Sequence, residues 1–180
     1  MNIVDGWLVQ ATKFSSPNFN LRPVDQVVNL LIIHNISLPP SEFGNNYIEQ
    51  FFLNQLPYEA HSYFEQLKGL EVSSHFLIKR NGEIQQFVSC ENRAWHAGQS
   101  SYCGNENCND FSIGIELEGT DIIPYELIQY DALHHLTLAI QSEYPNITSS
   151  RITGHENISP GRKTDPGPSF NWPAYLSRLS

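Results

Sequence analysis

The fold of this chain is decided by the stretch Val27-Val28-Asn29-Leu30-Leu31-Ile32-Ile33, which runs directly into His34 and Asn35. A near-continuous apolar run of this length, bounded by polar residues, is typical of a strand that is buried on both faces of a sheet. We therefore expect residues 27–33 to form a buried strand. Such a strand would present the imidazole of His34 at its end.

A second strand is indicated by residues 111–117, in which apolar residues alternate with polar or small ones. Successive side chains of a strand point to opposite faces, so the two faces of this strand differ in character. The apolar face holds Phe111, Ile113, Ile115 and Leu117, and the other face holds Ser112, Gly114 and Glu116. The missing side chain of Gly114 would let a metal ion or a substrate approach closely.

Turn and helix signals surround these strands. Asn81-Gly82 separates two alternating runs and predicts a hairpin with a type I′ turn. The longest helical pattern covers residues 125–144, between Pro124 and Pro145. We also expect short helices at 47–53, 60–67 and 170–179, a last strand at 151–153, an irregular segment at 1–24, and a loop at 37–44 that suits a wall or lid over a site. This pattern predicts an α/β fold, a single domain over residues 1–180 with helices on a central mixed β-sheet.

Composition narrows the function. The net charge of −9 disfavours binding to nucleic acid, and no apolar run approaches the roughly 20 residues that span a bilayer. The N-terminus lacks the basic and apolar regions of a signal peptide. Cys90, Cys103 and Cys108 are expected to be free thiols, with Cys103 and Cys108 as metal ligands the weaker alternative. These features predict a cytoplasmic protein.

Several residues that could bind a metal or act in catalysis lie in one C-terminal run, Gly154-His155-Glu156-Asn157-Ile158-Ser159-Pro160-Gly161-Arg162-Lys163-Thr164-Asp165-Pro166-Gly167-Pro168. His155 and Asp165 are suitable metal ligands, and His34 could supply a third. Two imidazoles and one carboxylate with an open position are typical of a catalytic zinc site. If the loop is extended, Lys163 and Asp165 project to the same side, while Arg162 points away.

Glu116 is the candidate general acid/base, since a carboxylate near a metal can accept a proton from water and pass it to a leaving amine. Lys163 would then face the oxyanion that forms on the attacked carbonyl. Together these groups describe metal-assisted amide hydrolysis. Taken singly, each residue is more often structural, as a polar group at a strand end, a turn residue or a solvated charge. The hypothesis therefore depends on their combination.

The chain resembles the AmpD-type N-acetylmuramyl-L-alanine amidases, a branch of the zinc amidases related to peptidoglycan-recognition proteins. The resemblance covers residues 27–168, and its matching segments occur in the family's order. They are residues 34–40, 74–78, 93–98, 109–119, 152–155 and 162–168. The resemblance implies a peptidoglycan-recognition/amidase-like fold and Zn²⁺ held by His34, His155 and Asp165. It also implies Glu116 as general acid/base and Lys163 as oxyanion stabiliser.

The family's substrates are muropeptides that carry 1,6-anhydro-N-acetylmuramic acid, which are imported during cell-wall recycling. The bond cut joins the lactyl carbonyl to L-alanine. These substrates can induce β-lactamase expression, so their removal has an indirect regulatory effect. Asn35, Trp95 and His96 look like substrate-binding residues. Glu71 departs from the family's pattern, in which an arginine at this position can meet a peptide carboxylate.

Two other functions remain open from the sequence. A non-catalytic peptidoglycan-binding module would be expected to lack a zinc ligand, whereas all three candidates are present here. An exported amidase that acts on intact cell wall would be expected to carry a signal peptide. No membrane or protein partner is indicated by any segment of the chain, so a small muropeptide is the expected partner.

Overall fold

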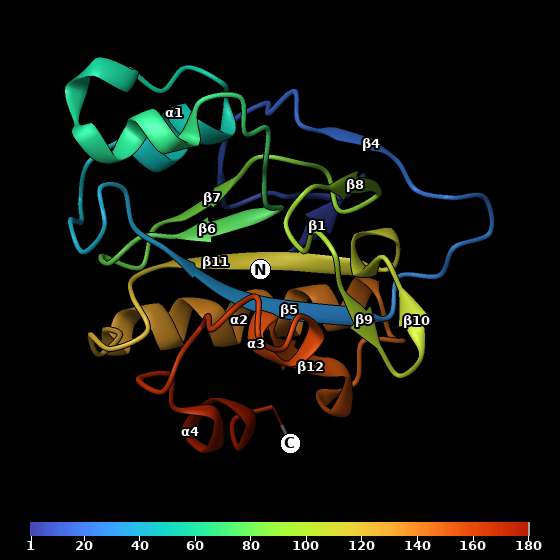
Figure 1. Cartoon of the computed structure of the whole chain (residues 1–180). Helices are drawn as coiled ribbons and strands as arrows, with labels where there is room; N and C mark the ends of the chain where they lie inside the picture. The colour runs from blue at the N-terminus through green and yellow to red at the C-terminus, as the bar shows by residue number, and fades with distance from the viewer. Residues whose placement is uncertain (180) are drawn as a thin grey trace.

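Six strands form the central sheet of the computed structural model, which describes residues 1–179 (Figure 1). In spatial order they are β12 (Ile152–Gly154), β5 (Leu30–Ile36), β11 (Ser112–Glu118), β6 (Phe76–Ile78), β7 (Ile84–Gln86) and β3 (Thr12–Lys13). The first four run parallel, β7 is antiparallel to β6, and β3 is parallel to β7. The sheet is therefore mixed, as the sequence predicts.

The two central strands are buried throughout most of their length, which explains their apolar composition. Strand β5 begins three residues later than predicted and continues to Ile36, so His34 lies inside the strand rather than after it. Ile113, Ile115 and Leu117 share one apolar cluster, as expected from the alternation. Phe111 does not belong to that face. It precedes β11 and packs with Leu30 and Ile32 on the opposite side.

Helix α2 (Leu127–Glu143) covers one face of the sheet, below β5 and β11 in Figure 1. The predicted helix is confirmed, and Leu133, Leu136 and Ile140 form a fully buried stripe that faces the sheet. The helix begins after Glu126, where a reciprocal capping box with Gln129 satisfies backbone donors that would otherwise lack partners. Glu126 thus fixes the start of the helix two residues beyond the predicted one.

The opposite face is covered by α1 (Tyr47–Phe52), η1 (Tyr58–Ala60) and η2 (Ser62–Leu67). Their apolar side chains form a second core with the sheet, which includes Phe51, Phe52 and Phe64. The helix predicted at 60–67 is a 3-10 helix. Lys79 joins this layer to the sheet, since its ammonium group lies 3.2 Å from Glu49 and 3.3 Å from Glu118.

The predicted hairpin is formed by β6 and β7, but its turn is not type I′. Ile78 pairs with Ile84, and the amide of Gly82 donates to the carbonyl of Lys79 at 2.9 Å. Gly82 has a φ of 83°, whereas Asn81 is not among the residues with positive φ. A type I′ turn needs positive φ at both central residues. The loop is instead a longer one with a single left-handed glycine.

The remaining elements are short, and they correct the irregular segment predicted at 1–24. Residues 1–24 contain β1, β2, β3 and β4, and β4 pairs with β8. The bounds of the other elements are β1 (Ile3–Val4), β2 (Trp7–Leu8), β4 (Phe19–Leu21), β8 (Asn92–Ala94), β9 (Ser101–Tyr102), β10 (Asn105–Glu106), η3 (Cys108–Asp110), η4 (Ser149–Arg151), α3 (His155–Ile158) and α4 (Trp172–Leu176). The predicted C-terminal helix corresponds to α4, and the predicted last strand to β12.

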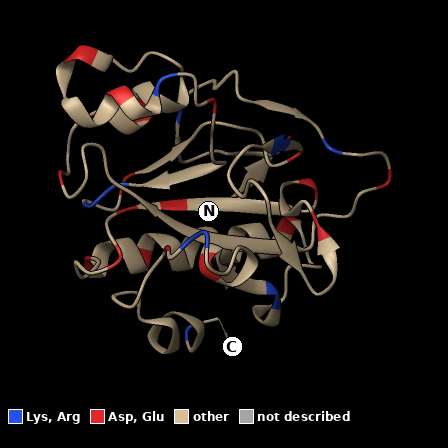
Figure 2. Ribbon diagram, in the orientation of Figure 1, with Lys and Arg blue, Asp and Glu red and all other residues tan. Residues whose placement is uncertain are grey.

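The basic residues are dispersed over the fold, and the cysteines are thiols. Lys and Arg segments are spread over the ribbon in Figure 2 rather than gathered on one element. All three cysteines are free, with Cys90 and Cys108 buried and Cys103 exposed. No helix within residues 1–179 combines the length and the apolar character needed to cross a membrane.

Candidate active site

The site lies toward the carboxyl ends of three neighbouring parallel strands, where the register brings distant residues together. Glu116 of β11 is paired with His34 of β5, so their side chains leave the same face of the sheet. On the other side of β5, Gly154 of β12 pairs with Ile33, which places His155 beside His34. Ligands of open α/β sheets typically bind at this end of the strands.

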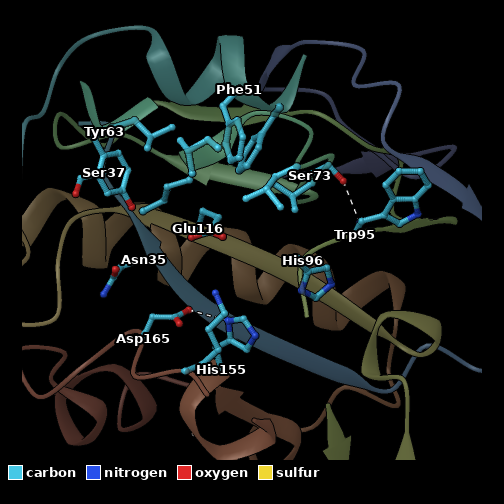
Figure 3. A pocket seen from close by; sticks show the side chains of 17 residues that line it. Asn35, Ser37, Phe51, Tyr63, Ser73, Trp95, His96, Glu116, His155 and Asp165 are labelled. Atoms are coloured by element: carbon cyan, nitrogen blue, oxygen red, sulfur yellow. Dashed lines mark hydrogen bonds and ion pairs between the residues drawn. The ribbon is translucent and has the colours of Figure 1, made fainter. Parts of the chain in front are cut away.

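Three ligand atoms converge at this end of the sheet. The Nδ1 atoms of His34 and His155 are 2.9 Å apart, and Asp165 Oδ2 lies 3.1 Å from the first and 3.0 Å from the second. The two histidines are almost fully buried, and the Asp165 side chain is 14% exposed. This triangle forms a group that could hold a metal ion, and two of its members, His155 and Asp165, line the cavity (Figure 3).

The loop that delivers Asp165 is held on both sides. The amide of Glu156, in the first turn of α3, donates to the carbonyl of Asp165 at 2.9 Å. The next carbonyl, that of Pro166, accepts from the hydroxyl of Tyr125 at 2.7 Å and from the amide group of Asn35 at 3.1 Å. The carboxylate of Asp165 is therefore fixed against the sheet by backbone contacts.

Glu116 lines the same cavity as His155 and Asp165. It is 9% exposed, and its Oε2 atom is buried without a hydrogen-bond partner among the described residues. Burial raises the pKa of Glu116 well above its ordinary value, and the nearby Asp165 carboxylate raises it further, while Lys163 opposes the shift. A carboxyl group in this state holds a proton more readily than an exposed glutamate does, which suits a role in proton transfer.

The two basic residues of the C-terminal loop differ in their surroundings. Lys163 is exposed and lines the cavity together with Glu116. The guanidinium group of Arg162 instead donates to the carbonyls of Ala97 at 2.6 Å and Gln99 at 2.8 Å. Lys163 is therefore the cation that faces the candidate metal site, whereas Arg162 fastens the loop to the segment around Ala97.

The cavity has a volume of about 330 Å³ and two unlike walls. One wall carries the polar groups described above. The opposite wall is apolar, and α1, η2 and the segment after them supply its side chains, among them Phe51, Phe52, Tyr63, Leu67 and Val72 (Figure 3). The predicted loop wall contributes Ser37 and Leu38. The apolar wall could not be predicted from the sequence, because short amphipathic segments alone do not reveal which cavity they face.

The three predicted substrate residues all line this cavity, and each is already tied to the protein. The amide group of Asn35 donates to Asp121 at 2.8 Å, and the indole N–H of Trp95 donates to Asn20 at 2.8 Å. His96 Nδ1 lies 2.9 Å from His34 Nε2. These contacts hold the three side chains in place at the rim and floor of the cavity.

Gly114 has a different role from the predicted one. The space above it is filled by the ring of His96, since a β-carbon on Gly114 would lie 2.5 Å from His96 Nδ1. Its backbone is held by two further side chains. The Gly114 amide donates to His75 Nδ1 at 3.0 Å, and its carbonyl accepts from Ser74 at 2.8 Å. The glycine therefore admits a protein side chain rather than a metal or a substrate.

Comparison with known proteins gives matches over the whole chain. Residues 24–168 match the family described as N-acetylmuramoyl-L-alanine amidase. The chain is 51% identical to the 1,6-anhydro-N-acetylmuramyl-L-alanine amidase AmpD of Citrobacter freundii over 180 residues, which cover 100% of this chain and 96% of that protein. The crystal structure of a selenomethionine derivative of AmpD superposes with a TM-score of 0.97, at 50% identity and full coverage of both chains.

A more distant solved structure contains a substrate. It is the N-acetylmuramyl-L-alanine amidase AmiD of Escherichia coli in complex with anhydro-N-acetylmuramic acid-L-Ala-D-γ-Glu-L-Lys. The identity is 30% and the TM-score is 0.61, and the match covers 87% of this chain and 60% of that one. The common fold therefore accommodates an anhydromuramic peptide in that relative.

Proposed function

Because the chain belongs to the N-acetylmuramoyl-L-alanine amidase family, we propose that it hydrolyses the amide bond between the lactyl group of 1,6-anhydro-N-acetylmuramic acid and L-alanine in muropeptides. The observation that carries this proposal is the convergence of His34, His155 and Asp165 beside the buried carboxyl of Glu116. A non-catalytic binding module would not need this combination.

Zinc is the metal that suits the donor set best. Two imidazole nitrogens and one carboxylate oxygen, with the fourth side open, are typical of catalytic zinc sites. The observed separations of 2.9–3.1 Å are close to the roughly 3.3 Å between neighbouring ligands in a tetrahedral zinc site. Burial lowers the pKa of His34 to about 4, so this imidazole is neutral at pH 7 and able to bind a cation.

The residues around the metal position suggest how each would act. Bound zinc would supply Lewis-acid chemistry and would lower the pKa of a coordinated water. Glu116 would accept the proton from the attacking water and deliver it to the departing amine of L-alanine. Lys163, on the same cavity, would stabilise the negative charge that develops on the carbonyl oxygen.

The cavity also fits the shape of the substrate. Its apolar wall suits the methyl and ring carbons of an anhydro-sugar, and the half-buried indole of Trp95 offers a face on which a sugar can pack. Asn35 and His96 are the remaining candidates for contact with the substrate. The free thiols of all three cysteines are consistent with a reducing compartment, and we place the reaction in the cytoplasm, in muropeptide recycling.

The proposal is tested by incubating the purified protein with an anhydro-muramyl tripeptide and identifying the products by mass spectrometry. We expect release of the free tripeptide and the anhydro-sugar, loss of this activity on treatment with a chelator, and recovery on addition of zinc. The variant His34→Ala should neither retain zinc nor cleave the substrate. Absence of cleavage by zinc-loaded protein, or full activity of His34→Ala, would contradict the proposal.

A further inference from the structure

A chain of hydrogen bonds runs from the protein interior to the candidate metal site. The hydroxyl of Ser112 lies 2.6 Å from the carbonyl oxygen of Cys108. The same oxygen, Ser112 Oγ, lies 3.3 Å from Nε2 of His96. The other ring nitrogen of His96 is 2.9 Å from His34 Nε2. Ser112 and His34 are almost fully buried, and His96 is 8% exposed, toward the cavity.

The direction of each hydrogen bond follows from the chemistry of the groups. A carbonyl oxygen only accepts, so Ser112 must use its single O–H for Cys108. Ser112 therefore accepts from His96, which places the proton of His96 on Nε2. The ring nitrogens of His96 contact only His34 and Ser112 among the described residues, and a buried imidazolium without a carboxylate partner is strongly disfavoured, so the ring is neutral. His96 Nδ1 is then a bare acceptor, and His34 must donate to it from Nε2.

A second contact determines which ring nitrogen of His155 carries the proton. His155 Nε2 lies 3.0 Å from the carbonyl oxygen of Ala97, which can only accept. Arg162 Nη2, which can only donate, lies farther from this nitrogen at 3.4 Å, so the shorter contact with Ala97 places the proton of His155 on Nε2. Both rings are left with bare Nδ1 atoms that point at one another and at Asp165. Three sets of lone pairs at this distance repel unless a cation lies between them.

His96 and Ala97 are consecutive residues, and one side chain holds both. The Oδ1 atom of Asn109 accepts from the amide of His96 at 3.1 Å and from the amide of Ala97 at 2.8 Å. We propose that the dipeptide His96-Ala97, held by Asn109, is a positioning element that fixes His34 and His155 in the tautomer presenting Nδ1 to the metal. This inference rests on the metal site of the proposed function and adds the groups that orient its ligands.

The proton positions can be measured without an assay of activity. Long-range ¹H–¹⁵N correlation spectra of the uniformly ¹⁵N-labelled, zinc-loaded protein at pH 7 distinguish the two tautomers of each neutral histidine. We expect His34, His96 and His155 all to carry their proton on Nε2. A proton on Nδ1 of His34 or His155 would overturn the proposal, whatever the protein binds.

The matched variants are His96→Leu and His96→Asn, whose side chains have nearly the same shape. Leu removes the acceptor for His34, whereas the amide oxygen of Asn can replace Nδ1. Zinc affinity, measured by competition with a chromogenic chelator, should fall about 10- to 100-fold in His96→Leu, and His96→Asn should recover most of the loss. His135→Leu, on an exposed position of α2, is the control and should bind zinc as tightly as the wild type.

The outcomes separate the two proposals. If folded His96→Leu binds zinc with wild-type affinity and only its KM for the muropeptide rises, His96 is a substrate contact and the positioning role is wrong. If the wild type itself binds no zinc, the proposed metal site fails, whereas zinc binding with a proton on Nδ1 of His34 or His155 would show that only the positioning role is wrong. Thermal unfolding of the metal-free variants shows whether each one is folded under the conditions of the titration.

Discussion

His96 lies directly over Gly114, so close that a β-carbon at residue 114 would stand 2.5 Å from Nδ1 and 2.6 Å from Cγ of the imidazole. Gly114 is not among the residues with positive φ, so its backbone would accept an alanine. The requirement for glycine is therefore steric. It comes from the ring that contacts His34, one of the three candidate ligands.

Gly114→Ala should therefore displace His96 and, through the contact of His96 with His34, disturb the candidate metal site. We expect a loss of about 1–3 kcal/mol in the free energy of unfolding, as for other insertions into packed interiors, together with weaker zinc binding. Urea unfolding and chelator competition measure the two effects. In a His96→Ala background, Gly114→Ala should lower the free energy of unfolding only slightly further, because the clashing ring is absent. An equal cost in both backgrounds would show that His96 is not the cause.

Glu116→Gln should keep the metal site but remove the proton acceptor. We expect kcat to fall by about 10²- to 10⁴-fold while zinc binding is unchanged. Steady-state kinetics with an anhydro-muramyl peptide and metal analysis of the purified variant provide the measurement. Loss of zinc from the variant would mean that Glu116 acts on the metal site itself and not only on the proton.

The raised pKa of Glu116 also predicts a pH dependence of stability. Between the pKa of an ordinary glutamate and the higher pKa of folded Glu116, the unfolded state releases a proton that the folded state keeps, so stability falls as the pH rises. Glu116→Gln lacks this effect. Metal-free Glu116→Gln should therefore be more stable than metal-free wild type at pH 7, and the difference should disappear toward pH 4. Equal stability at both pH values would be the contrary result.

Lys163→Met should lower kcat by about 10²- to 10³-fold, the usual effect of removing one group that stabilises an oxyanion. Because Lys163 contributes no ligand atom to the metal triangle, zinc binding should be retained. Lys68→Met is the matched control, since Lys68 pairs with Glu65 on the surface. A rise in KM with unchanged kcat would show that Lys163 binds the substrate equally well before and during the reaction.

Lys79→Met should destabilise the fold by about 3–5 kcal/mol, because it leaves the carboxylates of Glu49 and Glu118 buried without their partner. Equilibrium unfolding in urea measures this loss. Replacing both carboxylates by Gln in the same variant should restore much of the stability. If the free energy of unfolding of Lys79→Met lay within about 1 kcal/mol of the wild-type value, the cluster would contribute no more than an ordinary surface ion pair.

The parts of the fold that could be predicted are those with strong local patterns. Strand β11 and helix α2 follow directly from hydrophobic periodicity, and β5 follows from its apolar run. The strands at the N-terminus could not be predicted, because they are two or three residues long and exist through pairing with distant segments. The predicted type of the turn at Gly82 was wrong, because the length of a hairpin loop depends on where its two strands stop pairing.

The residues of the candidate site also differ in how well the sequence reveals them. Residues with distinctive chemistry, such as His34 and Asp165, stand out in the sequence and converge in the structure. Their supports do not stand out. Ser112 and Asn109 are ordinary polar residues whose importance arises from their contacts with the His96 ring and with the backbone of His96 and Ala97. Gly114 indicated that some group lies close to this strand, but the sequence could not show that the group is the ring of His96.

The order of strands in the sheet has a consequence for biosynthesis. His34 and Asp165 are separated by 131 positions, and the edge strand β12 that leads to His155 is made almost last. A chain emerging from the ribosome thus exposes one imidazole long before its partners exist. Tight metal capture has to wait for the final fifth of the polypeptide to dock against β5. We therefore expect a metal held by this triangle to be acquired late, by a chain whose remaining sheet has already been translated.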